Sequence, residues 1–417
     1  MIGGVMLLLG CSPASTGGTP NAPVASAPDQ PKTQKVLTIA LQADREPPSP
    51  AMFGSPGGGT GTGSGSSSLE PFYVFHSTLT TYDPSGTAIP VMAQKIPSLQ
   101  DGDWKLPPEG GMEVTWKLKP GILWHDGTPL TTADLILGYQ LNTDPELSSI
   151  PGELANITNL KALDDQTLVV TWKTVSIAGG VSGYDGIAAA PKHIFGDMYA
   201  AGDKTALQNS PYWSTQFVGL GPYRLTQWSR GSFIEGTAFD QYFGGRPKID
   251  RVVLKFLGDV NAIVANMLSG DVDMIPLGAQ LDAQPLSVVR DAWIPTNGGT
   301  TGAVAKGVRS LYLQFKDPSA PWAQDLRVRQ AMLHALDRDS IVDNLEADLT
   351  QRADFFAPIG DPVLNQATSQ ALPQYKFDLT RVAQLMGEAG WTKGADGTFR
   401  NAAGQPFSIA VATSNEG

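Results

Sequence analysis

Short runs of alternating apolar and polar residues recur along the chain and predict strands. In the clearest run, Met112, Val114, Trp116 and Leu118 alternate with polar residues. A period of two places the apolar side chains on one face of a strand, which predicts a half-buried strand. A continuous apolar run at residues 36–41, VLTIAL, predicts a buried strand. Further strands are predicted at residues 168–172, 252–256, 311–315 and 407–411.

Other segments carry apolar residues at three- and four-residue spacing, which predicts amphipathic helices with recognisable ends. Asp259 stands at an N-cap position, and Gly270 follows the last apolar residue of that helix. A strand, a helix and the short apolar segment 272–275 then follow one another, as in a crossover unit packed on a sheet. Further helices are predicted after the Thr131/Asp134 capping box, at residues 325–336, and from the cap Asp378 to Gly390.

Mixed strands and helices in a chain of 417 residues predict an α/β protein of about three domains. The hydrophobic fraction of 41% fits a folded protein and excludes a disordered one. The net charge of −11 argues against nucleic-acid binding, because phosphate recognition requires clustered positive charge. The single cysteine excludes a disulfide framework and a cysteine-based zinc finger.

The N-terminus predicts export. Residues 1–10 are apolar and too short to span a bilayer, and the segment ending at Cys11 resembles a bacterial lipobox, although no Lys or Arg precedes it. Residues 1–11 are therefore interpreted as a lipoprotein signal, with Cys11 as the lipidated residue. A cysteine buried at the start of a core strand is the alternative. Residues 12–35, rich in Ser, Pro, Thr, Gly and Ala, predict a flexible tether.

The chemistry-bearing residues do not form an enzymatic pattern. The carboxylate pairs Asp101/Asp103, Asp164/Asp165 and Asp271/Asp273 are sequence neighbours, whereas glycoside hydrolysis requires carboxylates that face each other across a cleft. His125 precedes Asp126 in a predicted tight turn, and a structural role is the simpler interpretation.

Two further patterns lead to the same conclusion. The four histidines at positions 76, 125, 193 and 334 are far apart, so no zinc-hydrolase motif is present. The Gly-rich segment 57–63 lacks the Gly-Lys-Ser/Thr ending of a phosphate-binding loop, which favours a surface loop. We expect no catalytic residue, no metal and no cofactor.

Five ordered sequence blocks resemble the extracellular solute-binding proteins of family 5, the peptide/nickel-type receptors of ABC importers. The longest block is TWKLKPGILWHDGTPLTTADLILGY at residues 115–139. The others are KALDD at 161–165, blocks within 218–274 that include GLGPY and LSGDVD, DLRVRQAMLHALDRDSIV at 325–342, and EAGW at 388–391. Leu220 is a minor departure from the family pattern. Family members also continue past Gly417, and in peptide-binding relatives that stretch carries the aspartate that pairs with the peptide ammonium group.

The resemblance implies a large, cleft-type, type II periplasmic-binding-protein fold with an inserted extra lobe. Lobe I is expected at residues 36–70 and 186–300, and lobe II is expected as an insertion at 71–185. Lobe III is expected at 301–417 and is expected to be incomplete. Ligand would be enclosed between lobes by hinge closure.

The implied function is capture of a solute, expected to be a peptide, outside the cytoplasm by a lipid-anchored monomer. The expected partners are the membrane permease and the ATPase of the importer. By position, Gly57, Gly58, Gly59, Tyr312 and Gln314 are the candidate ligand-binding residues, with a core aromatic as the alternative for Tyr312. Nickel complexes and oligosaccharides remain open as ligands. A secreted lipoprotein hydrolase of peptide or glycan is the alternative function.

Overall fold

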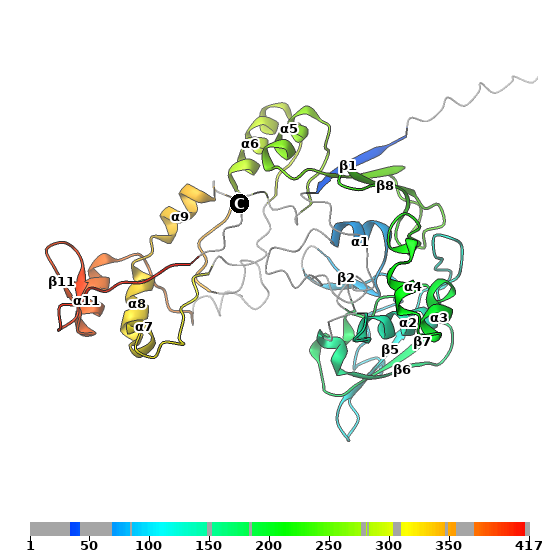
Figure 1. Cartoon of the computed structure of the whole chain (residues 1–417), viewed down its shortest axis with the longest axis horizontal. Coiled ribbons are helices and arrows are strands. Elements are labelled where there is room, and N and C mark those ends of the chain that lie inside the picture. The colour runs from blue at the N-terminus through cyan, green and yellow to red at the C-terminus, as the bar shows by residue number, and fades with distance from the viewer. Residues whose placement is uncertain are drawn as a thin grey trace, which may run out of the picture. The chain divides into compact units, whose positions relative to one another are not determined.

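The computed structural model describes most of the chain from residue 34 onward (Figure 1). Contacts divide the chain into residues 1–34 and residues 35–417, and all elements below belong to the second unit. The described ranges are 34–41, 69–83, 86–147, 152–182, 186–276, 281, 283–302, 310–346, 349–355 and 371–412.

A four-stranded mixed sheet forms around the predicted first strand, in the order β1-β10-β9-β8. Its strands are β1 (Val36–Leu41), β10 (Arg251–Phe256), β9 (Phe233–Ala238) and β8 (Tyr223–Ser229). β1 and β10 are parallel, and Ile39 also forms a parallel bridge with Met274 on its other side. Helix α5 (Val260–Ser269) links β10 to Met274, so the predicted crossover is present with a single bridge in place of a full strand.

Apolar side chains cover both faces of the parallel pair, which explains the unbroken apolar run in β1. Ile39 and Leu41 pack into one buried cluster with Leu254, on the face toward helix α1 (Leu69–Phe75). Ala40 packs into another, formed largely by α5 and α6 (Ala283–Trp293). The backbone of β1 therefore lies between two cores.

A second four-stranded sheet is antiparallel and has the order β4-β5-β7-β6. Its strands are β4 (Trp104–Lys105), β5 (Met112–Lys117), β7 (Thr167–Trp172) and β6 (Ile157–Ala162). The alternation predicted for β5 is confirmed, because Met112, Val114 and Trp116 are buried and the residues between them are not. Helix α2 (Thr132–Thr143) begins where predicted, and the Asp134 carboxylate accepts the Thr131 N–H at 2.8 Å.

A helical unit follows residue 320 and holds its own apolar core. Its elements are α7 (Pro321–Gln324), α8 (Leu326–His334), α9 (Arg338–Leu345), α11 (Leu379–Glu388) and the hairpin β11 (Thr392–Lys393)/β12 (Phe399–Arg400). Val328 and Ala331 of α8 are buried against Val382, Leu385 and Met386 of α11. The predicted helix 325–336 is confirmed, although α8 ends at His334 and leaves Leu336 exposed.

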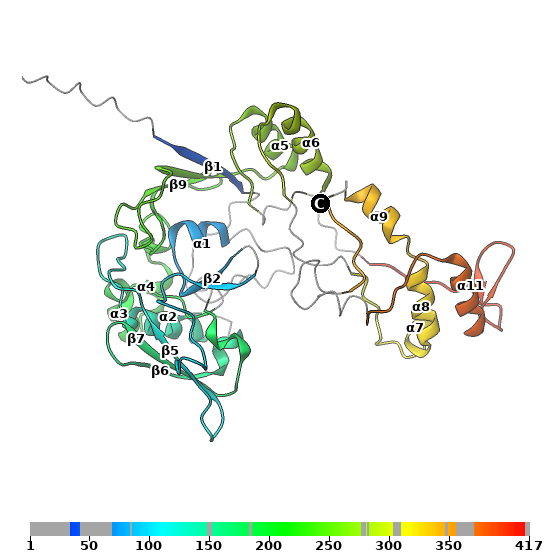
Figure 2. The ribbon, with the colours of Figure 1, turned by 180° about the vertical axis from the view of Figure 1, so that it is seen from behind.

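The remaining helices and strands are short and can be followed from behind in Figure 2. They are β2 (Thr80–Tyr82), β3 (Ala88–Pro90), α3 (Lys192–Ala200) and α4 (Lys204–Gln208), besides short 3-10 turns. None of the described helices is long and apolar enough to cross a membrane.

Two predicted strands, 311–315 and 407–411, are wrong. Both have the alternating pattern, but neither pairs as a strand with another described segment. The Gln314 carbonyl instead accepts the Trp322 indole N–H at 2.8 Å. The Phe407 N–H donates to the Phe399 carbonyl at 2.7 Å, and Pro406 adds only an isolated bridge to Arg400. An alternating pattern needs a hydrogen-bonding partner to become a strand, and the pattern itself does not supply one.

Candidate functional site

The carboxyl ends of the parallel strands meet at one edge of the first sheet. β1 ends at Leu41, β10 ends at Phe256, and the bridge residue Met274 runs in the same direction beside them. In open α/β sheets, ligands bind at the carboxyl edge of such strands, where the loops diverge. This edge is therefore the candidate ligand-binding site of the described residues.

Hydrogen bonds between distant segments fix the backbone of β1 from Thr38, in its middle, to Leu41, at its carboxyl end. The Asp273 carboxylate accepts the Thr38 N–H at 2.7 Å, and the Asp273 N–H donates to the Thr38 carbonyl at 2.9 Å. The Ala40 N–H donates to the Met274 carbonyl at 2.9 Å, and the Leu257 N–H donates to the Leu41 carbonyl at 2.8 Å. The edge is thus a rigid base for the segments that leave it.

Several predicted site residues lie outside the described part of the chain. These are Gly57, Gly58 and Gly59, which belong to the segment that leaves β1 at this edge and returns at α1. Cys11 and the tether up to residue 33 also lie outside the described residues.

Tyr312 and Gln314 are described, and their surroundings differ. Tyr312 is 90% exposed, so the alternative of a core aromatic does not fit. Gln314 is fixed locally. Its side-chain oxygen accepts the Lys316 backbone N–H at 2.7 Å, and its backbone carbonyl accepts the Trp322 indole N–H. Tyr312 therefore presents a free aromatic surface, whereas the Gln314 side chain already has a backbone partner.

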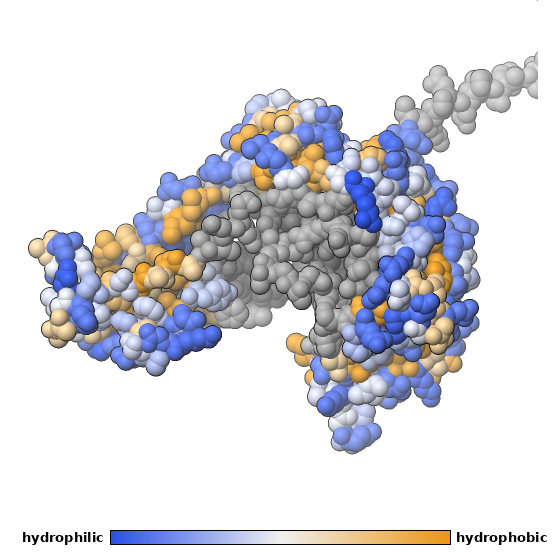
Figure 3. Space-filling model, in the orientation of Figure 1, coloured by the Kyte–Doolittle hydropathy of each residue, from blue (hydrophilic) through white to orange (hydrophobic). Residues whose placement is uncertain are grey.

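Apolar side chains also reach the surface over α8 and α9 (Figure 3). Leu326 and Leu333 of α8 and Ile341 and Leu345 of α9 are each between 39% and 57% exposed. The opposite side of α8 is buried against α11, so this helix has apolar residues on more than one face.

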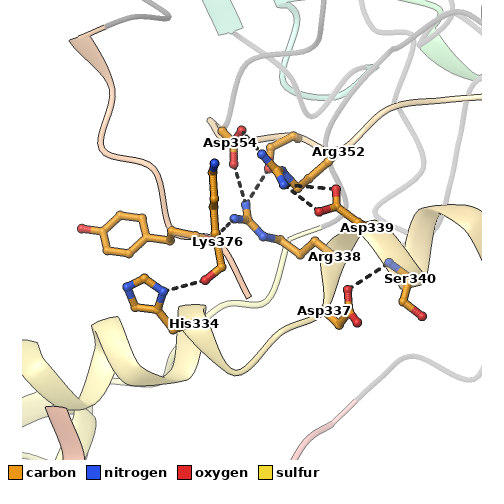
Figure 4. A network of polar contacts seen from close by, with 10 residues as sticks. His334, Asp337, Arg338, Asp339, Ser340, Arg352, Asp354 and Lys376 are labelled. Carbon is orange, nitrogen blue, oxygen red and sulfur yellow. Dashed lines mark hydrogen bonds and ion pairs between the residues drawn. The ribbon is translucent and has the colours of Figure 1, made fainter. Parts of the chain in front are cut away.

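Polar contacts hold α9 and the segments beside it (Figure 4). Arg338 pairs with Asp354 at 3.2 Å and donates to the carbonyls of Ala353 and Tyr375. Arg352 pairs with both Asp339 and Asp354, at 2.8 and 3.1 Å. Each charge has an opposite partner, so this network joins segments of the fold and leaves little capacity for a charged ligand.

Two histidines, His76 and His193, pack against Trp124, which spacing along the chain did not predict. The ring centroids of His76 and His193 lie 5.8 and 6.0 Å from that of Trp124. His193 also contacts the Asp126 carboxylate at 2.7 Å. The planes of the His76 and His193 rings are inclined to that of Trp124 by 33° and 65°. The described residues contain no group of three or more His, Cys, Asp or Glu that could hold a metal ion.

The buried His125 binds backbone groups with both ring nitrogens. Nδ1 accepts the Gly219 N–H at 3.1 Å, and Nε2 lies 3.0 Å from the Gly221 carbonyl. Burial lowers the pKa of His125 to about 4. Burial and, secondly, the nearby His125 lower the pKa of His76 to about 3. Both imidazoles are therefore neutral at neutral pH, and His125 has the structural role expected from the sequence.

The carboxylate pairs likewise serve local structure. Asp101 and Asp103 both pair with Lys95, at 2.8 and 2.6 Å. Asp164 accepts the Gln166 N–H in its turn, while Asp271 accepts the Ser269 hydroxyl. Lys95 lies between Asp101 and Asp103 and pairs with both, and Asp164 and Asp271 each accept a local hydrogen bond, so these carboxylates have structural partners.

The comparisons with known protein families and with curated proteins agree with each other. A family model described as bacterial extracellular solute-binding proteins, family 5 Middle, matches residues 96–417. A putative ABC transporter peptide-binding protein from Brucella ovis is 26% identical over 272 residues, which are 65% of this chain and 48% of that protein. The chain thus spans about half the length of the curated relatives it matches.

Solved structures show the same fold. The oligopeptide-binding protein AppA from Bacillus subtilis, in complex with a nonapeptide, is 23% identical with a TM-score of 0.57, covering 90% of this chain and 68% of its own. NikZ from Campylobacter jejuni, in complex with Ni(L-His), is 21% identical with a TM-score of 0.60, covering 90% of this chain and 66% of its own. The predicted α/β, type II periplasmic-binding-protein-like fold class is confirmed.

Proposed function

Because this chain belongs to the bacterial extracellular solute-binding proteins of family 5, we propose that it is the solute-binding component of an ABC importer. The observation that carries the proposal is the family match over residues 96–417. The carboxyl edge of the parallel β1/β10 pair supports it, because ligands bind at this edge in open α/β sheets.

Peptides are the proposed ligand class. Two of the curated relatives are named as a putative peptide-binding protein and an oligopeptide-binding protein. An exposed aromatic ring such as Tyr312 can cover a ligand backbone or side chain without selecting one sequence. Nickel complexes and oligosaccharides are the competing ligand classes, and one structural relative is a complex with Ni(L-His).

The proposed site combines Tyr312 and Gln314 with Gly57, Gly58 and Gly59. The Gly-rich segment runs between β1 and α1, which lie on either side of one apolar cluster. Glycines permit close approach of a ligand to the backbone. Gln314 would contribute through its position next to Tyr312, since its side-chain oxygen already accepts a local hydrogen bond.

Three lobes are proposed for the body of the protein. Lobe I comprises residues 36–70 and 186–300, lobe II comprises 71–185, and lobe III begins at 301. The distribution of the two four-stranded sheets supports the first two lobes, because all strands of one sheet fall in lobe I and all strands of the other in lobe II. The core shared by α8 and α11 supports the third.

Lipid anchoring at Cys11 and a tether at residues 12–35 would hold the protein outside the cytoplasm. The monomer would deliver its ligand to a permease powered by an ATPase. Delivery requires binding without turnover, and the described residues of the site, Tyr312 and Gln314, do not favour the hydrolase alternative.

Extraction of small molecules from the purified full chain, followed by mass spectrometry, tests the ligand class. Intact peptides released in stoichiometric amount would support the proposal. A defined nickel complex or oligosaccharide in their place would assign the other ligand classes. Progressive shortening of added peptides by the pure protein would favour the hydrolase.

A further inference from the structure

We propose that His125 is a positioning residue: in its neutral form it holds the Gly219–Gly221 loop against the C-terminal end of α1 by hydrogen bonds, and acid breaks this arrangement. These hydrogen bonds are called the His125 clasp below. The inference uses contacts among residues 75–77, 125 and 219–221, none of which is a proposed ligand residue. It goes beyond solute binding, because it assigns a conformational role to a residue of the fold.

Only one protonation state of the ring satisfies both neighbours. The Gly219 N–H can only donate, so Nδ1 must accept and carry no hydrogen. The Gly221 carbonyl can only accept, so Nε2 must carry the hydrogen. The backbone N–H of His125 adds a third bond to the Gly219 carbonyl at 3.0 Å. Neutral His125 thus matches the loop at three points.

The clasped loop lies directly on the C-terminal end of α1. The Gly221 N–H donates to the Phe75 carbonyl at 3.1 Å, and the Ser77 hydroxyl donates to the Leu220 carbonyl at 2.9 Å. A Cβ atom on Gly219 would lie 1.9 Å from the Phe75 oxygen. The loop and the end of α1 are in backbone-to-backbone contact, so a shift of the loop must also shift the end of α1.

The position of α1 matters because α1 receives the Gly-rich segment. That segment leaves the sheet at Leu41 and ends where α1 begins at Leu69. The hydrogen bonds of Thr38 and Ala40 with residues 273–274 fix β1, which precedes the Gly-rich segment in the chain. The His125 clasp fixes α1, which follows the Gly-rich segment in the chain.

Protonation of Nδ1 would place an N–H opposite the Gly219 N–H and remove one of the three bonds. Burial and the Arg224 cation oppose the imidazolium, and neutral His76 does not stabilise it. His76 approaches from the end of α1 and Arg224 from β8. Asp126, in the same turn, would attract the positive charge, but its carboxylate already contacts His193 and the Thr128 N–H. Acid therefore stabilises the open loop relative to the closed one.

The test uses the full chain and needs no ligand, so it remains decisive even if the proposed function is wrong. With only four histidines in the chain, ¹⁵N-labelled histidine gives a spectrum that single substitutions can assign. We expect His125 at pH 7 to carry its hydrogen on Nε2. A hydrogen on Nδ1, or a charged ring at pH 6, would overturn the proposal.

Amide exchange of residues 217–223 and 69–78, corrected for intrinsic rates, then measures opening. In the wild type we expect the opening constant to rise about tenfold per pH unit as pH falls from 6 to 4.5. The Gln side chain in His125→Gln retains one donor and one acceptor but does not titrate. The opening constant of this variant should therefore rise markedly less than that of the wild type as pH falls from 6 to 4.5. His193→Gln, which removes a histidine from the same cluster, should behave as the wild type. Equal pH dependence in the wild type and His125→Gln would overturn the proposal.

Discussion

The carboxylate of Asp273 accepts the backbone N–H of Thr38 at 2.7 Å, although the two residues are 235 positions apart. This bond joins the segment after α5 to the middle of β1. Asp273→Ala should therefore lower the free energy of unfolding by about 1 kcal/mol, the typical net value of such a hydrogen bond. Urea denaturation measures the change.

Asp271→Ala is the matched control for this prediction. Asp271 lies two residues earlier in the same motif and is exposed, as Asp273 is, but its carboxylate accepts a hydroxyl of its own turn and no backbone N–H of a distant described segment. Its replacement should change the free energy of unfolding by a few tenths of a kcal/mol at most. Equal effects of the two substitutions would contradict the role given to Asp273.

Gly221 has no space for a side chain. A Cβ atom there would lie 2.4 Å from the Phe75 carbonyl carbon and 2.5 Å from the His76 nitrogen, both of which are backbone atoms. Gly221→Ala should therefore lower the free energy of unfolding by about 3 kcal/mol or more, or prevent folding.

Gly387 provides the contrasting case. It lies inside α11, and a Cβ atom there would meet nothing within 4 Å. Gly387→Ala should raise the free energy of unfolding by up to about 1 kcal/mol, because alanine favours the helix. Thermal melts of both variants test the pair, and a stabilised Gly221→Ala would show that the loop does not pack on α1 as described.

The core between α8 and α11 predicts that replacing two leucines of α11 by alanine lowers the free energy of unfolding by different amounts. Leu385 is 2% exposed and Leu379 is 57% exposed. Leu385→Ala should lower the free energy of unfolding by about 2–5 kcal/mol, whereas Leu379→Ala should change it by less than about 1 kcal/mol. Similar values in urea denaturation would mean that α11 does not pack on α8.

Acid should destabilise the fold before most carboxylates titrate. The folded-state pKa values of His76 and His125, about 3 and about 4, lie below the ordinary value of 6.5. Below pH 6.5 the unfolded chain therefore binds more protons than the folded chain, and stability falls as pH falls toward 4. Each histidine contributes up to about 1.4 kcal/mol per pH unit. Urea denaturation at pH 7 and pH 5 measures the slope, and equal stability at both values would contradict neutral buried rings.

The sequence predicted those elements whose signals are local. The caps Asp259 and Asp378 accept backbone N–H groups of the first turns of α5 and α11. Gly270 and Gly390 both adopt positive φ where these helices end, at +81° and +85°. Alternation in β5 matched its burial because β7 lies beside it and supplies a complete ladder.

Features that depend on distant partners were missed. Residues 311–315 and 407–411 alternate as β5 does, yet no described segment pairs with them. The contacts of His76 and His193 with Trp124 arise from tertiary packing, which periodicity does not encode. The paired glycines 219 and 221 were the available signal, because glycine at both positions indicates a close backbone approach.

Tyr312 tests the location of the ligand site separately from stability. Its ring is 90% exposed, so Tyr312→Ala should leave the free energy of unfolding unchanged within about 0.5 kcal/mol. If Tyr312 contacts ligand, peptide affinity should fall about tenfold, which corresponds to about 1.4 kcal/mol. Tyr82→Ala, at another exposed tyrosine (57%) on β2, should leave affinity unchanged. Calorimetric titration that shows no difference between the two variants would remove Tyr312 from the site.

Solute capture without turnover is the central claim, and native mass spectrometry of the full chain with a mixed peptide library measures it directly. The account predicts a one-to-one complex of the protein with intact peptides that survives prolonged incubation. Peptides shortened during the incubation, or no complex with peptide, Ni(L-His) or oligosaccharide under conditions in which the protein is folded, would contradict it.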